Sequence, residues 1–265
     1  MVLPDVPVRR STASVDVLAD LARTGLSLVD AVPDPVSLLA LARCIGAVVV
    51  PHRDSGPDGV TVIEDRGASA AALAGFTCAS LYPHTDRSGV VDPPGLLFTV
   101  CGREPTEGGE SLLVDGRAVY LDLEENDPEA LAALSVPSSA LFGGADGCLA
   151  SVFATTNDVV SIRLRLDSLA RFGSRVEPHI PALRAGIERH MWAVPARSGT
   201  GYVLDNRRWL HGRRSYVGPR VIYRITADAS RSDIVMGGFP RSMDTQPGES
   251  RFDHSIGRNA GEYES

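Results

Sequence analysis

A histidine and an aspartate, His84 and Asp86, are separated by a single residue in the chain. On an extended segment their side chains point to the same face, where both could bind one metal ion. Among the six histidines, His211 has the best context for a third ligand, because it ends an apolar stretch that follows the polar turn 205–208. Two histidines and one carboxylate on one side of a metal leave three coordination positions open, as in a non-haem Fe(II) site.

Two arginines, Arg220 and Arg224, follow His211 within 13 residues. Positions four apart on a strand share a face, so both guanidinium groups are predicted to point into the same space. A buried arginine without an anion is costly, which predicts a carboxylate ligand there. The segment Gly108-Gly109-Glu110-Ser111 opens a strand, and the hydroxyl of Ser111 could bond the same carboxylate.

Other charged residues are weaker candidates. Arg53 lies in a polar segment before His84, where it could contact a substrate or belong to a surface loop. Arg163 alternates with Arg165 on a predicted strand, so Arg163 could line a pocket or face solvent. The pair Asp205-Asn206 could form a turn or support the metal ligands.

The elements that must position these residues are mainly strands. Helical spacing or capping residues predict helices over 12–24, 34–45 and 180–192. Short apolar runs between turn residues predict strands at 60–63, 96–101, 111–114, 159–166, 202–204 and 221–226. This pattern predicts a mainly β fold with flanking helices, a jelly roll. We expect one domain over residues 1–265, with a helical part at about 12–46, the jelly-roll core at about 47–228 and a largely irregular polar segment at 229–265.

Composition narrows the class of protein. The net charge is −7 and lysine is absent, so all 26 fixed cations are arginines. The acidic balance disfavours nucleic-acid binding, and no apolar run reaches the roughly 20 residues of a membrane span. Neither a signal peptide nor a paired cysteine motif is evident, and the four cysteines are predicted to be core residues. These features predict a cytoplasmic protein with a small-molecule substrate, without a nucleic-acid or membrane partner, and with self-association left open.

Four blocks, taken in this order, resemble the motifs of the TauD/TfdA-like Fe(II)- and 2-oxoglutarate-dependent oxygenases, including the clavaminate synthase-like branch. The blocks are Tyr82-Pro83-His84-Thr85-Asp86, Gly108-Gly109-Glu110-Ser111, the stretch 204–213 that contains His211, and Arg220-x-x-x-Arg224. The resemblance implies a double-stranded β-helix, which is a cupin-like jelly roll.

The resemblance also implies roles for individual residues. It makes His84, Asp86 and His211 the ligands of Fe(II), and it assigns Ser111 and Arg220 to the distal carboxylate of 2-oxoglutarate. Arg224 is expected to face an acidic group of the primary substrate. The segment between His211 and Arg220 is shorter than is usual in the family, so the two arginines could exchange these roles.

The implied reaction uses Fe(II), 2-oxoglutarate and O₂ to hydroxylate an aliphatic C–H bond of a small carboxylate-bearing substrate. A free amino acid or a derivative, in bacterial specialised metabolism, is the favoured class. Asp86 argues against halogenation, because related halogenases lack this carboxylate. Desaturation, cyclisation, and a betaine or sulfonate substrate remain alternatives. A zinc hydrolase and a non-catalytic metal-binding jelly roll are alternatives of another class.

Overall fold

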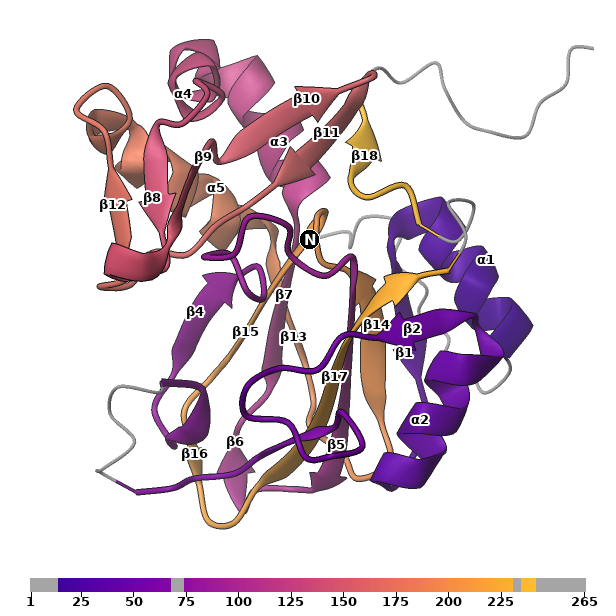
Figure 1. Ribbon diagram of the computed structural model, residues 1–265. Helices are drawn as coiled ribbons and strands as arrows, with labels where there is room; N and C mark the ends of the chain where they lie inside the picture. The colour runs from indigo at the N-terminus through magenta and orange to yellow at the C-terminus, as the bar shows by residue number, and fades with distance from the viewer. Residues whose placement is uncertain (1–13, 68–73, 231–234, 242–265) are drawn as a thin grey trace, which may run out of the picture.

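A computed structural model describes residues 14–67, 74–230 and 235–241 of the chain. Two antiparallel sheets face each other at its centre (Figure 1). The larger sheet has the order β1 (Leu26–Val29), β14 (Gly201–Asp205), β5 (Leu96–Arg103), β17 (Val221–Ala229) and β2 (Ala47–Val49), with β3 (Thr61–Ile63) also paired to β17. The smaller sheet has the order β13 (Met191–Val194), β7 (Ser111–Asp115), β15 (Trp209–Arg213) and β4 (Leu81–His84).

Strand β5 is buried on both faces because both sides of the larger sheet are covered. Leu96, Phe98 and Val100 belong to the core beneath the N-terminal helices, whereas Leu97 belongs to the core between the sheets. Successive side chains of a strand point to opposite faces, so one continuous apolar run supplies both cores. The predicted strands at 60–63, 96–101, 111–114, 202–204 and 221–226 are confirmed within a few residues.

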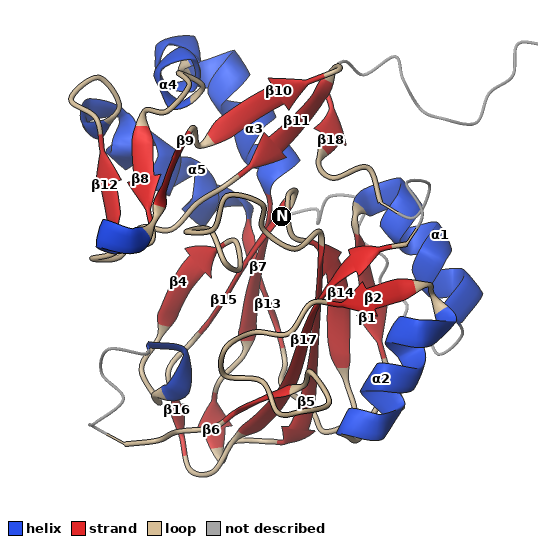
Figure 2. Ribbon diagram, in the orientation of Figure 1, coloured by secondary structure: helices blue, strands red, loops and turns tan. Residues whose placement is uncertain are grey.

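Helices α1 (Ser14–Thr24) and α2 (Pro35–Cys44) pack on the outer face of the larger sheet (Figure 2). Asp34 caps α2 by accepting a hydrogen bond of 2.8 Å from the backbone N–H of Ser37, and Pro35 occupies the first turn. Both features favour a helix start. The two helices predicted near the N-terminus are therefore confirmed.

A second group of helices lies at the other side of the molecule, beside two three-stranded sheets, and a separate two-stranded sheet lies at the opposite end of the central sheets (Figures 1 and 2). These helices are α3 (Gly116–Asn126), α4 (Pro128–Leu134) and α5 (Ile180–His190). The short strands are β6 (Glu107–Gly108), β8 (Ala140–Phe142), β9 (Cys148–Ala150), β10 (Phe153–Thr156), β11 (Val159–Ile162), β12 (Ala170–Phe172), β16 (Tyr216–Val217) and β18 (Phe239–Pro240). Short 3₁₀ turns stand at Ala74–Phe76, Gly144–Asp146 and Glu177–His179.

The sequence pattern did not predict α3 and α4. The side chain of Asp115 accepts from the N–H of Arg117, and Asp127 accepts from the N–H of Ala130. Asp127 precedes Pro128, which is the same signal that predicts α2. The signal for α4 was therefore present in the sequence.

Two predicted boundaries are wrong. The helix predicted over 180–192 ends at His190, because Met191 and Trp192 pair with β7 as part of β13. The Trp192 ring also packs edge-on against Trp209, with the ring centroids 6.3 Å apart. The strand predicted over 159–166 ends at Ile162. In both cases tertiary contacts override the local apolar pattern.

Two further expectations need correction. Cys101 is buried, but Cys44 and Cys78 are exposed and are not core residues. Phe239, within the segment predicted to be irregular, is buried and its ring meets Tyr120 at 5.6 Å. Residues 231–234 and 242–265 of that segment lie outside the described residues. Within the described ranges, no helix has the length and apolarity required to cross a bilayer.

Candidate functional site

A cavity of about 270 Å³ lies between the two sheets. Strand β17 contributes Ile222 and Arg224, and Arg220 directly precedes the strand. From the smaller sheet, His211 and Arg213 of β15 line the cavity, while Leu210, directly before His211, belongs to the core on the opposite face. The period of two along each strand therefore directs the polar residues inward.

His84 and His211 are direct cross-strand partners on β4 and β15. Their ring centroids lie 4.4 Å apart. Nδ1 of His84 donates to the carbonyl of Tyr82 at 3.0 Å, because a carbonyl can only accept, and Nε2 therefore keeps its lone pair. Burial lowers the pKa of both histidines, His211 well below its ordinary value. The two neutral imidazoles are thus in the form that binds metals.

Asp86 lies two residues beyond the end of β4, near the same pair of rings. Its Oδ2 forms an ion pair of 3.2 Å with Nη1 of Arg224. Burial alone would raise the pKa of Asp86, but Arg224 and the two histidines lower it below its ordinary value. The carboxylate is therefore ionised at neutral pH, as a metal ligand requires.

The side-chain amide of Asn206 anchors the backbone at Asp86. Its Oδ1 accepts from the N–H of Asp86 at 2.7 Å, and its Nδ2 donates to the carbonyls of Asp86 at 3.0 Å and Pro94 at 2.9 Å. Asn206 is 1% exposed. This amide connects the loop of Asp86 to the turn before β15, which carries His211.

The side chains of His84, Asp86 and His211 suit a divalent metal for two reasons. They are of types that bind metals, and two of their polar atoms have no hydrogen-bond partner. Oδ2 of Asp86 and Nδ1 of His211 are buried and have no hydrogen-bond partner, which is unusual for polar atoms in a protein interior. Within the described ranges, however, no three His, Cys, Asp or Glu side chains are already arranged as a complete metal site. The pairing of Asp86 with Arg224 accounts for the carboxylate's present position.

Ser111 and Arg220 line the same cavity, from β7 and from the start of β17. Both are buried, and Nε of Arg220 has no hydrogen-bond partner. Burial lowers the pKa of Arg220, and the Tyr216 ring lies 5.3 Å from its guanidinium carbon. A guanidinium buried without a carboxylate is suited to bind one from a ligand.

Two cavity residues beside Ser111 were not predicted from the sequence. Tyr202 and Thr99 are cross-strand partners, and Thr99 is also the partner of Arg224. Burial raises the pKa of Tyr202, although the hydroxyls of Thr99 and Ser111 oppose this shift. A hydroxyl-bearing residue within an apolar strand is the only local signal, and it is too common to identify them.

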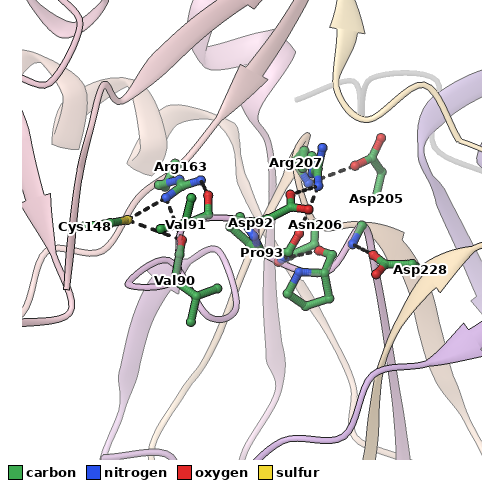
Figure 3. A network of polar contacts seen from close by, with 12 residues as sticks. Val90, Val91, Asp92, Pro93, Cys148, Arg163, Asp205, Asn206, Arg207 and Asp228 are labelled. Carbon is green, nitrogen blue, oxygen red and sulfur yellow. Dashed lines mark hydrogen bonds and ion pairs between the residues drawn. The ribbon is translucent and has the colours of Figure 1, made fainter. Parts of the chain in front are cut away.

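The three arginines predicted to contact the substrate lie in different surroundings. Arg224 lines the cavity with a largely buried side chain. Arg53 also lines it, but its side chain is 74% exposed and contacts Asp54 at 3.6 Å. Arg163 does not line this cavity. Its guanidinium instead donates to the carbonyls of Val90 and Val91, each at 2.9 Å (Figure 3). Arg165, its neighbour on the predicted strand, does line the cavity and pairs with Asp167.

Three comparisons place the chain among known proteins. The human gamma-butyrobetaine dioxygenase (Homo sapiens) is 27% identical over 181 residues, which is 61% of this chain and 46% of that relative. The match thus spans less than half of the relative's length. Among solved structures, an asparagine oxygenase in complex with Fe(II), 2S,3S-3-hydroxyasparagine and succinate has a TM-score of 0.68 at 15% identity, over 82% of this chain and 79% of that one.

A second solved structure is the non-heme iron oxygenase OrfP in complex with Fe and alpha-ketoglutaric acid. Its TM-score is 0.64 at 16% identity, over 81% of this chain and 79% of that one. At such low identities these likenesses show the fold, and they confirm the predicted jelly roll. A family model described as "Taurine catabolism dioxygenase TauD, TfdA family" matches residues 2–226. This match covers most of the sequence, so the chain belongs to the taurine catabolism dioxygenase TauD, TfdA family.

Proposed function

We propose that this protein is an Fe(II)- and 2-oxoglutarate-dependent oxygenase that hydroxylates an aliphatic C–H bond of a small carboxylate-bearing substrate. The observation that carries the proposal is the meeting of His84, Asp86, His211, Ser111 and Arg220 around one cavity. The family assignment and the bound Fe(II), succinate and alpha-ketoglutaric acid of the similar structures support it.

In this proposal His84, Asp86 and His211 hold the metal. Fe(II), with 2-oxoglutarate and O₂, supplies the oxidising power for breaking a C–H bond. His84 is kept in one tautomer by the Tyr82 carbonyl, so its Nε2 is free to bind. Asn206 fixes the backbone of Asp86, which limits the positions that its carboxylate reaches.

Arg220 and Ser111 hold the distal carboxylate of 2-oxoglutarate, and Arg224 faces the acidic group of the substrate. The buried and unpartnered Nε atoms of both arginines support these assignments. Their job is to orient the two small molecules, because a fixed geometry lowers the entropic cost of reaction. The cavity lies between the two sheets, so rigid strands hold these side chains in place.

We favour a free amino acid or a derivative as the substrate, because similar structures hold 3-hydroxyasparagine and hydroxylated arginine. A betaine is a second candidate, since the human relative is a gamma-butyrobetaine dioxygenase. The same residues serve either class, and also a desaturation or a cyclisation. A non-catalytic metal-binding jelly roll gives no reason for the Ser111 and Arg220 pair.

The test is an anaerobic titration of the protein with Fe(II) and then 2-oxoglutarate. We expect a weak visible charge-transfer band in the wild type, its loss in Asp86→Ala and His211→Ala, and its retention in His179→Ala, a histidine outside the cavity. Arg220→Ala is expected to need a much higher concentration of 2-oxoglutarate. A wild type without a band and without slow succinate formation contradicts the proposal, and a defect in Arg224→Ala alone would show that the two arginines exchange roles.

A further inference from the structure

The arginines of the cavity differ in whether their charge is already compensated. The arginines that line it are Arg53, Arg87, Arg165, Arg213, Arg220 and Arg224. Three of them form ion pairs. Arg53 pairs with Asp54, Arg165 with Asp167, and Arg224 with Asp86. Arg213 donates to backbone carbonyls of residues 74–79. Among these six described cavity arginines, Arg87 and Arg220 are the two with neither a carboxylate partner nor a side-chain hydrogen bond.

Arg87 combines an uncommon backbone conformation with a buried, unpartnered side-chain nitrogen. It directly follows Asp86, and its φ is 53°, in the left-handed region that non-glycine residues adopt at a free-energy cost. Its Nη1 is buried and has no hydrogen-bond partner. Strained residues that the surroundings hold in place are concentrated at binding sites. The turn over 86–89 fixes the backbone of Arg87, whereas the buried Nη1 has no partner within the described residues.

The loop that carries Arg87 is held firmly. The N–H of Val90 bonds the carbonyl of Arg87 at 3.1 Å, and Arg163 donates to the carbonyls of Val90 and Val91 (Figure 3). Gly89 packs closely on Gly143. A Cβ added to Gly89 would lie 2.6 Å from the Cα of Gly143. A guanidinium on such a loop is pre-organised, which lowers the entropic cost of binding an anion.

The charges around the cavity oppose a cationic substrate. His52 lines the cavity, and burial lowers its pKa most. The charges of Arg224 and Arg87 lower this pKa further, whereas Asp86 and Asp54 raise it. The described lining holds six arginines and three aspartates, and each aspartate already pairs with an arginine, so a quaternary ammonium group would meet a net positive charge. Acidic groups, in contrast, would gain charge-assisted hydrogen bonds from an arginine without a partner.

We propose that Arg87 binds a second acidic group of the primary substrate, so that the substrate is a small compound with two acidic groups and not a betaine. The inference rests on the proposed function, in which Arg220 holds 2-oxoglutarate and Arg224 the first acidic group. Among the described arginines of the cavity, Arg87 is then the one left without a carboxylate partner. It acts as a specificity residue, because a neutral analogue leaves its charge unpaired.

The experiment measures the binding of matched acidic and neutral amino acids to protein loaded with Mn(II) and 2-oxoglutarate. The pairs are L-aspartate and L-asparagine, L-glutamate and L-glutamine, and O-phospho-L-serine and L-serine. At least one acidic member is expected to bind at least tenfold more tightly than its neutral partner. That preference should disappear in Arg87→Gln and remain in Arg197→Gln, which removes an exposed arginine outside the cavity.

Arg87→Gly is the second variant, since glycine adopts a φ of 53° without strain. It should lose the acidic preference while its unfolding temperature stays at or above that of the wild type. If no acidic member binds more tightly than its partner, or if the preference survives in Arg87→Gln, the inference is wrong. Titration of 2-oxoglutarate separates the two proposals: failure in the wild type overturns the function, and a loss confined to Arg87→Gln assigns Arg87 to the co-substrate.

Discussion

Asn206 connects the segments that supply two of the proposed metal ligands. Its amide makes three hydrogen bonds, two of them to the backbone of Asp86, and it stands five residues before His211. Residues that orient a ligand in this way usually contribute 10- to 100-fold to metal affinity. The role of Asn206 follows from these contacts and does not require Asn206 to touch the metal.

Replacing Asn206 with alanine is therefore expected to weaken Mn(II) binding by at least tenfold. The N–H of Asp86 would lose its acceptor, and the carboxylate would sample more positions. Anaerobic calorimetry at pH 7 measures the affinity. Asn126→Ala, which removes an exposed amide from α3, is the matched control and should bind Mn(II) like the wild type. Equal affinities for both variants would contradict the positioning role.

At the scale of elements, strand β15 connects the proposed metal site to residues 74–79 beside the cavity. Arg213 is two residues after His211 on the same face, and it is 5% exposed. Its guanidinium donates to the carbonyls of Ala74, Gly75, Thr77 and Ala79. Residues 74–79 make little regular backbone pairing, and the Arg213 side chain supplies hydrogen bonds to their carbonyls instead. The planar guanidinium has five N–H donors, so it can reach several carbonyls at once.

Arg213→Lys should lower the free energy of unfolding by about 2–3 kcal/mol, since a lysine leaves some of these carbonyls unpaired. Urea denaturation measures the change. Arg214→Lys is the control, because that side chain is 61% exposed and its ion pair with Glu110 spans 3.7 Å. The control should change stability by less than about 0.5 kcal/mol. A small effect of Arg213→Lys would mean that residues 74–79 do not depend on this guanidinium.

At the scale of the whole molecule, Asp205 connects distant parts of the chain. Its carboxylate accepts from the N–H of Arg207 at 2.8 Å and from the N–H of Gly238 at 2.9 Å. It is 1% exposed, and burial raises its pKa from 3.8 to about 6. The folded state therefore binds a proton more tightly at this group than the unfolded chain does.

The raised pKa of Asp205 makes its contribution to the free energy of unfolding fall as the pH rises. Below pH 4 the carboxyl is protonated in both states, and its full contribution to stability is present; this contribution is lost as the pH rises through about 6. Relative to Asp205→Asn, the wild type should lose roughly 2–3 kcal/mol between pH 4 and pH 7. Urea denaturation of both proteins at the two pH values measures this difference. A difference that stays constant, or that grows in favour of the wild type, would contradict the raised pKa.

The order of chemical groups along the chain was readable from the sequence. The His-x-Asp pair, the later His211 and the two arginines have side chains suited to a metal and to carboxylates, and this depends on residue type alone. The short apolar runs of β5 and β17, bounded by turn residues, also predicted strands, because turn residues limit each run to the length of a strand. These local features were enough for the jelly roll and for most of the proposed site.

Only the tertiary structure decided which residues meet. The register of β15 against β4 places His211 opposite His84, and the amide of Asn206 reaches the backbone of Asp86 across 120 residues of sequence. It also separates Arg163, which holds a loop, from Arg87, which lines the cavity without a partner. Spacing within one strand determines the face on which a side chain lies. Its partner depends on strand pairing and packing between distant segments, and no local pattern contains that information.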